Sequence, residues 1–184
     1  MKKILKILGI VLLCFIVLVL LTAVFVRKDY SVERQVTLQK PKQVVFDYVK
    51  YLKNQSQYSV WAKIDPNMKT EYRGTDGTVG FVSAWDSQVR DAGKGEQEIT
   101  GIDDGKRIDY EIRFYKPMKS TDNAYMSFEN VNDSVTNVKW VFYGKVKYPM
   151  NLSLLFMNMD AMLGKDLENG LSNLKTILEN KNSQ

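Results

Sequence analysis

The first part of the chain is one long apolar stretch. Residues 7–26 contain no charged side chain and consist mainly of Leu, Val and Ile. A helix of this length, rising 1.5 Å per residue, spans the roughly 30 Å hydrocarbon core of a bilayer. The pattern therefore predicts a transmembrane helix.

Two alternatives compete with a membrane anchor. A cleaved signal peptide is one, because Lys2, Lys3 and Lys6 make a basic start. The apolar stretch is longer than the roughly 7–15 residues of a signal core, and residues 21–23 make a poor cleavage site. A buried core helix is the other. We expect an uncleaved anchor over residues 1–28 and a single domain over residues 29–184.

Behind the apolar stretch, short segments alternate between apolar and polar positions and are separated by turn residues such as Gly, Asn and Asp. This pattern is typical of an antiparallel meander. Two short helical pieces are expected after the first strand, over 44–52 and 55–61. The predicted strands cover 30–38, 70–73, 79–86, 95–102, 107–115, 123–130 and 134–145.

The end of the chain changes period. Leucines recur every three or four residues from Leu163 to Leu178, which predicts one long amphipathic helix beginning near Asn151. A curved sheet with one apolar face buries that face most simply against this helix. We therefore expect an α+β helix-grip fold, in which about seven strands wrap on the C-terminal helix and leave a pocket between helix and sheet.

The net charge of +5 belongs to the apolar segment rather than to the domain. Its five flanking basic residues are Lys2, Lys3, Lys6, Arg27 and Lys28, and residues 29–184 carry 21 basic against 21 acidic side chains. A formally neutral domain gives no reason to expect a nucleic-acid partner. The expected partners are the membrane, through residues 7–26, and a small molecule.

Two residue types that carry much enzyme chemistry are scarce. The chain has no histidine, and its single cysteine, Cys14, lies in the apolar stretch. Zinc sites of Cys and His, Ser-His triads and disulfide frameworks are therefore excluded for the domain. No metal and no cofactor is expected.

Strand parity predicts which side chains face the pocket. The polar groups on the inner parity are neutral, whereas Asp86, Glu96, Glu98, Asp109 and Glu111 fall on the outer parity, where Lys94 and Arg113 can pair with them. The helix start adds apolar residues that could line an opening. The candidate ligand-binding residues are Phe81, Ser83, Trp85, Gln97, Tyr110, Ile112, Phe114, Met126, Phe128, Trp140, Phe142, Phe156, Met159 and Leu163.

The order of elements resembles a known superfamily. The resemblance rests on residues 41–49, on 79–80 with Trp85, on 93–99 and on 164–175, and it covers residues 30–180. The chain is similar to START-like (Bet v 1-like, SRPBCC) proteins, in particular to bacterial polyketide cyclase/dehydrase and lipid-transport domains. The resemblance implies the helix-grip fold. Because such folds host lipid carriers, hormone binders, cyclases and chaperone regulators, it implies no single activity.

These observations favour a membrane-anchored domain that binds a hydrophobic small molecule or lipid, with the domain on the extracytoplasmic side. An apolar pocket with a few neutral hydrogen-bonding groups suits such a ligand. Two alternatives stay open. One is a cyclase, dehydratase or isomerase with Tyr110 as its acid, and the other is a scaffold with a filled core whose outer face binds a protein.

Overall fold

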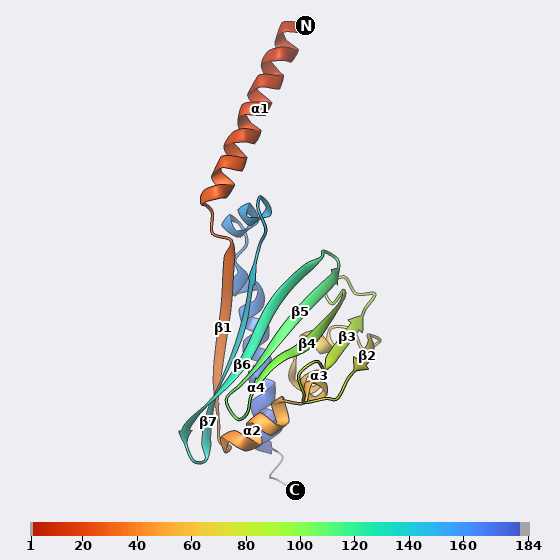
Figure 1. The fold of residues 1–184 in the computed structure, drawn as a ribbon, viewed down its shortest axis with the longest axis vertical. Helices are drawn as coiled ribbons and strands as arrows, with labels where there is room; N and C mark the ends of the chain where they lie inside the picture. Colours follow the sequence, from red (N-terminus) through yellow and green to blue (C-terminus); the bar gives the residue numbers. More distant parts are fainter. Residues whose placement is uncertain (1, 181–184) are drawn as a thin grey trace.

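A computed structural model of the chain describes residues 2–180 (Figure 1). Residues 181–184, which belong to the predicted domain of residues 29–184, lie outside the described residues. Helix α1 (Lys2–Phe25) stands away from the remaining chain (Figure 1).

The domain is built on one seven-stranded sheet. Its strands are β1 (Asp29–Leu38), β2 (Lys69–Arg73), β3 (Val82–Asp86), β4 (Lys94–Asp103), β5 (Arg107–Lys116), β6 (Ser120–Asn132) and β7 (Val135–Lys145). All neighbours are antiparallel, in the order β1-β7-β6-β5-β4-β3-β2. The predicted fold class is confirmed. Strand β3 begins three residues later than predicted, after Gly80, whose φ of 88° turns the chain out of extended geometry.

Four short helices fill the connection between β1 and β2. They are α2 (Lys42–Val49), η1 (Leu52–Asn54), α3 (Gln55–Tyr58) and η2 (Trp61–Lys63). Pro41 precedes α2, where its fixed φ suits a helix start, and Val45, Phe46 and Val49 turn inward from one face. This connection covers the open side of the sheet.

The C-terminal helix α4 (Met159–Asn180) begins eight residues later than predicted. Residues Met150–Leu155 form a separate 3-10 helix, η3. The break has a local cause, because the side chain of Asn158 accepts a hydrogen bond from the backbone N–H of Ala161 at 3.1 Å and so caps a new helix. From there α4 runs along β1 and buries Leu167, Leu171, Leu174 and Leu178.

The hydrophobic core lies entirely between Val32 and Leu178. Phe46 of α2 packs edge-on against Phe128 of β6, and Tyr58 of α3 packs edge-on against Trp140 of β7. No residue of α1 belongs to this core among the described residues. The domain therefore has a core of its own.

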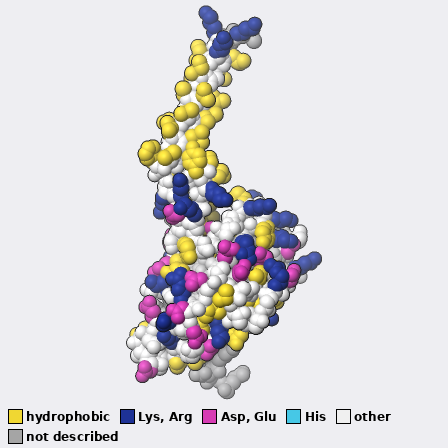
Figure 2. All heavy atoms as spheres, in the orientation of Figure 1, with side chains coloured by type: hydrophobic (Ala, Val, Ile, Leu, Met, Phe, Trp, Pro, Cys, Tyr) yellow, Lys and Arg dark blue, Asp and Glu magenta, His cyan; other side chains and the backbone are white. Residues whose placement is uncertain are grey.

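Helix α1 is hydrogen-bonded to the segment of the domain around η3. The Nδ2 atom of Asn151 donates hydrogen bonds to the carbonyl oxygens of Ala23 at 2.7 Å and Val26 at 3.0 Å, and the Tyr148 hydroxyl donates to that of Leu20 at 3.3 Å. Ala23 is the one buried residue of α1. Since nearly all other α1 side chains are exposed, the core-helix alternative is wrong (Figure 2).

Candidate ligand-binding cavity

A cavity of about 450 Å³ lies between the concave face of the sheet and the connection that covers it. This volume is within the range of roughly 300–1,000 Å³ that small-molecule sites occupy. Its walls are mostly apolar and aromatic. The lining residues are Leu52, Gln55, Ser56, Ser59, Trp61, Ala62, Asp65, Pro66, Met68, Thr70, Tyr72, Ser83, Trp85, Asp91, Ala92, Gln97, Ile112, Phe114, Ala124, Trp140, Phe142 and Leu163.

Eight of the predicted candidate residues lie in this wall. Seven come from the inner parity of the sheet and one from the start of α4, which is where strand alternation and helix periodicity placed them. They are Ser83, Trp85, Gln97, Ile112, Phe114, Trp140, Phe142 and Leu163.

The other six candidates lie elsewhere. Four of them, Phe81, Tyr110, Met126 and Phe128, are on the inner side but are buried in the packed core. Met159 packs against that core from the start of α4. Phe156 is 89% exposed, because it follows η3 rather than sitting inside the expected long helix. Strand parity predicts which face of the sheet a side chain lies on. Whether that side chain lines a cavity or is packed in the core depends on the layers that lie against that face.

Sequence reasoning missed the wall opposite the sheet. The C-terminal helix contributes only Leu163, and the segment from Leu52 to Met68 supplies the rest of the cover. The sequence pattern predicts a short helical piece over 55–61 here, but it does not predict that these residues cover the sheet. The signal that the segment offered was Trp61, a large aromatic side chain in a stretch without strand or long-helix periodicity.

All three tryptophans of the chain line the cavity. Trp61 and Trp140 meet edge to face, with ring centroids 6.0 Å apart. The Trp85 indole N–H donates to the carbonyl oxygen of Ala92 at 2.9 Å. Gly95 makes room for this ring, since a Cβ there would lie 2.6 Å from Trp85 Cζ2. Fixed rings of this kind give an apolar ligand flat contact surfaces.

The cavity contains one buried carboxylate, which corrects the expectation of purely neutral polar groups. Asp65 is 8% exposed and lies in the covering segment. Its Oδ1 accepts a hydrogen bond from the Asn67 N–H at 2.8 Å, and its Oδ2 accepts one from the Ser87 hydroxyl. Because both oxygens have protein donors, Asp65 holds the covering segment against the β3–β4 loop. A second carboxylate, Asp91, is exposed in the same wall.

The remaining polar groups of the wall are neutral. They come from α3, from β2 to β4 and from the turn after α3, and they offer hydroxyl and amide groups to a ligand. They are Gln55, Ser56, Ser59, Thr70, Tyr72, Ser83 and Gln97.

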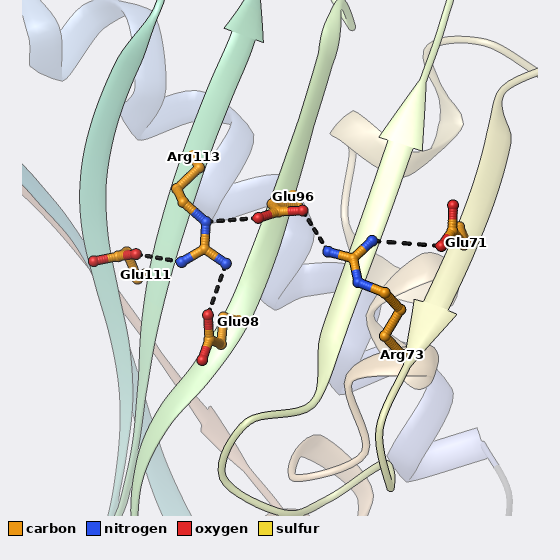
Figure 3. Close-up of polar contacts among 6 residues, drawn as sticks. All are labelled: Glu71, Arg73, Glu96, Glu98, Glu111 and Arg113. Carbon is orange, nitrogen blue, oxygen red and sulfur yellow. Dashed lines mark hydrogen bonds and ion pairs between the residues drawn. The ribbon is translucent and has the colours of Figure 1, made fainter.

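The carboxylates of β4 and β5 lie on the outer face, as parity predicted. Arg113 binds Glu96 and Glu98 at 2.7 Å each and also Glu111, while Arg73 binds Glu96 at 2.6 Å (Figure 3). Burial alone would raise the pKa of the Glu96 carboxyl, but hydrogen bonds from Arg73 and Arg113 outweigh it and hold the pKa below its ordinary value. This network is the charged back of the sheet, separate from the cavity.

The cavity occupies the half of the sheet next to α1. Residue pairing fixes this, because the start of β1, the end of β7 and the start of β6 lie at one end, with Asp29 opposite Lys145. The same end holds the end of β5 and the start of β4, where Lys94 lies opposite Lys116. Sheet residues of the cavity come from the middle of their strands or from that end, such as Phe142, Phe114 and Trp85.

The site shows no arrangement for proton transfer at Tyr110. Tyr110 does not line the cavity, and its burial raises the pKa of its hydroxyl above the ordinary value. Among residues 2–180, no group of three or more Asp, Glu, His or Cys side chains could hold a metal ion. What the cavity offers chemically is apolar surface with a few neutral donors and acceptors, besides the exposed Asp91 and an Asp65 carboxylate whose oxygens already have protein donors.

Comparison with protein families agrees with this geometry. Residues 29–179 match the family described as polyketide cyclase / dehydrase and lipid transport. The match spans every strand and the C-terminal helix of the domain. The comparison with curated proteins gave no match.

Solved structures share the fold at low sequence identity. A protein of Thermus thermophilus has a TM-score of 0.59 and 16% identity, over 84% of this chain and 100% of its own. Ara h 8.0201 has a TM-score of 0.56 and 14% identity, over 82% and 98%. An Aha1 dimer from Colwellia psychrerythraea has a TM-score of 0.55 and 11% identity, over 82% and 96%. At such identities the likeness establishes the helix-grip fold alone.

Proposed function

Because the chain belongs to the polyketide cyclase / dehydrase and lipid transport family, we propose that it is a membrane-anchored domain that binds an uncharged hydrophobic small molecule or lipid. The observation that carries this proposal is the cavity of about 450 Å³, walled by Trp61, Trp85, Phe114, Trp140 and Phe142. Each CH₂ group moved from water into such a wall contributes about 0.8 kcal/mol, so an acyl or isoprenoid chain binds usefully without ionic contacts.

Three features support the anchor. Helix α1 is long and apolar enough to cross a bilayer, and its side chains are exposed. Lys and Arg side chains gather at its two ends (Figure 2). Asn151 is fully buried, and its side chain donates hydrogen bonds to carbonyl oxygens at the end of α1. If α1 were a cleaved leader, the Asn151 side chain would lose these acceptors. The protein is then a single-pass membrane protein, with residues 1–28 as anchor and 29–184 as binding domain.

The charges before the span and the size of the domain after it support a proposal for the side of the membrane. The lysines Lys2, Lys3 and Lys6 before the span are costly to translocate, whereas a long domain crosses largely regardless of charge. We propose that the domain is extracytoplasmic. Its cavity then lies in the half of the sheet nearest the membrane, within reach of ligands dissolved in the bilayer.

The two alternative functions have less support. A scaffold with a filled core requires no sizeable cavity, whereas a cavity of about 450 Å³ is present. An enzyme with Tyr110 as acid requires that hydroxyl to face the substrate, whereas Tyr110 is buried outside the cavity wall. Neither alternative has a further observation in its favour.

The three cavity tryptophans provide the test. Residues 29–184, which have a core of their own, are titrated with the methyl ester of dibromostearic acid while tryptophan fluorescence is recorded. Bromine quenches indoles at short range, so a bound chain darkens rings that all line one cavity. We expect saturable quenching, and its absence with this ester and with a brominated isoprenoid would overturn the proposal.

A matched pair of variants locates the binding. Ser83 lines the cavity, and the adjacent Ala84 lies on the outer face, between Glu71 and Glu96. Ser83→Phe fills part of the cavity and should weaken ester binding by about tenfold or more, since several CH₂ contacts are lost. Ala84→Phe should leave binding unchanged. Equal affinities for the two variants would place the ester outside the cavity.

A further inference from the structure

Beside the end of α1, the domain exposes large apolar side chains that no protein layer covers. They are Met150, Leu155, Phe156 and Met157, which we call the η3 patch, and they are 64%, 57%, 89% and 38% exposed. Soluble surfaces seldom gather such side chains in one short segment. Figure 1 shows η3 at the end of the domain that faces α1.

Hydrogen bonds fix the level of this segment relative to α1. Tyr148 bonds the carbonyl oxygen of Leu20, and Asn151 bonds those of Ala23 and Val26. Residues 148–151 therefore run beside the last turns of the helix, over a rise of about 9 Å at 1.5 Å per residue. The apolar stretch 7–26 is just long enough for the hydrocarbon core, so its last turns lie at the edge of that core.

The charges around the patch match a lipid headgroup layer. Arg27, Lys28 and Lys147 lie on the two chain segments that join α1 and η3 to the sheet, and Lys145 is the last residue of β7 beside them. Lys145 pairs with Asp29 at 3.5 Å, which leaves this junction with an excess of positive charge. Figure 2 shows dark-blue side chains where the apolar helix meets the domain. Apolar side chains with a basic rim are typical of segments that lie in a membrane interface.

We propose that the η3 patch inserts into the interface of the bilayer that α1 spans, as a second membrane contact of the domain. This inference rests on the proposed anchor. Asn151 and Tyr148 then act as a clamp between the two contacts, so that the domain sits on the membrane in one orientation. The half of the sheet that holds the cavity faces the lipid.

The test measures the depth of three positions in the full-length chain, reconstituted in phosphatidylcholine vesicles that contain phosphatidylglycerol. An environment-sensitive fluorophore is attached to one cysteine at a time. Cys14 itself reports on the span, Phe156→Cys in a Cys14→Ser background reports on the patch, and Val131→Cys in the same background reports on water. Val131 is 60% exposed at the β6–β7 turn, far from α1.

Iodide in water and bromine at defined depths on lipid chains quench the label from opposite sides. At position 156 we expect iodide quenching at least about fivefold weaker than at position 131, together with quenching by bromine near the headgroups, as for a segment roughly 5–10 Å deep. Position 14 should respond to bromine near the chain ends.

Two results overturn the proposal, and they differ in what else they remove. If position 156 is as open to iodide as position 131 while position 14 is protected, the patch lies in water although the anchor stands. If position 14 is also open to iodide, the anchor fails and the patch proposal falls with it. Ester binding in the cavity is measured separately on residues 29–184 and does not depend on either result.

Discussion

At the scale of single residues, the outer face of the sheet shows how a partly buried carboxylate stays ionised. Glu96 is half-buried between Arg73 and Arg113, which donate hydrogen bonds to its two oxygens (Figure 3). Burial favours the protonated acid and the two guanidinium groups favour the carboxylate, with the guanidinium groups prevailing. The folded protein therefore stabilises the ionised form of Glu96.

We predict that Glu96 makes the domain sensitive to acid. Its folded-state pKa is lowered from the ordinary value of 4.5, so its contribution to stability is complete above pH 4.5 and is lost as the pH falls through the lower folded-state pKa. Urea unfolding of residues 29–184 between pH 3 and pH 7 should show this loss. The Glu96→Gln variant should be less stable at pH 7, and its free energy of unfolding should change less with pH. If the free energy of unfolding of Glu96→Gln depends on pH as steeply as that of the wild type, the prediction is contradicted.

At the scale of elements, α4 approaches the sheet closely where it carries glycine. A Cβ at Gly170 would lie 2.9 Å from Cζ3 of Trp140 and 3.6 Å from the carbonyl oxygen of Tyr58. Since Trp140 also lines the cavity, this contact links the packing of the helix to the shape of the site. Glycine has a low helix propensity, so Gly170 weakens the helix locally but allows it to pack closely against Trp140.

The Gly170→Ala substitution tests this balance. Alanine favours a helix by about 1 kcal/mol, but crowding a fixed indole costs about 1–3 kcal/mol, so we expect a net loss of roughly 1 kcal/mol and a shifted tryptophan emission spectrum. The exposed neighbour Asn169 is the control. Asn169→Ala gains propensity without crowding and should be slightly more stable than the wild type. Equal or greater stability of Gly170→Ala would show that the fit is loose.

The elements also show what the sequence could predict. Alternation predicted the seven strands and the cavity side of Ser83, Trp85 and Phe142, because a strand turns every second side chain to the same face. The predicted start of α4 was wrong. The apolar residues before it show no break in composition, and the helix start is set by one capping side chain, Asn158. The covering wall around Trp61 was missed, because loop placement depends on contacts between layers.

At the scale of the whole molecule, charge is divided between two parts. The five basic residues in excess flank the apolar stretch 7–26, and residues 29–184 are formally neutral. Glu96, Glu98 and Glu111 of β4 and β5 face away from the cavity and are paired with Arg113. Long-range fields therefore contribute little to what the domain binds.

We predict that binding of the uncharged brominated ester depends weakly on salt. Without ionic contacts in the cavity, the quenching constant of residues 29–184 should change less than about threefold between roughly 50 mM and 500 mM salt, since screening acts only on charged partners. The negatively charged dibromostearate serves as the comparison. A tenfold loss of ester binding in high salt would contradict the prediction, because an uncharged ester has no ionic contact that salt could screen.

The sheet is open, and its two edges differ in what supports them. Strand β1 is ten residues long and has α4 packed along it, whereas β2 and β3 are five residues each, and every side chain of β2 is exposed. Few buried contacts mean that this edge separates from the sheet at a smaller free-energy cost than the core. The β2–β3 hairpin forms part of the cavity wall. For the proposed ligand, we therefore expect entry by transient fraying of the β2–β3 hairpin, while the half of the domain joined to α1 stays folded.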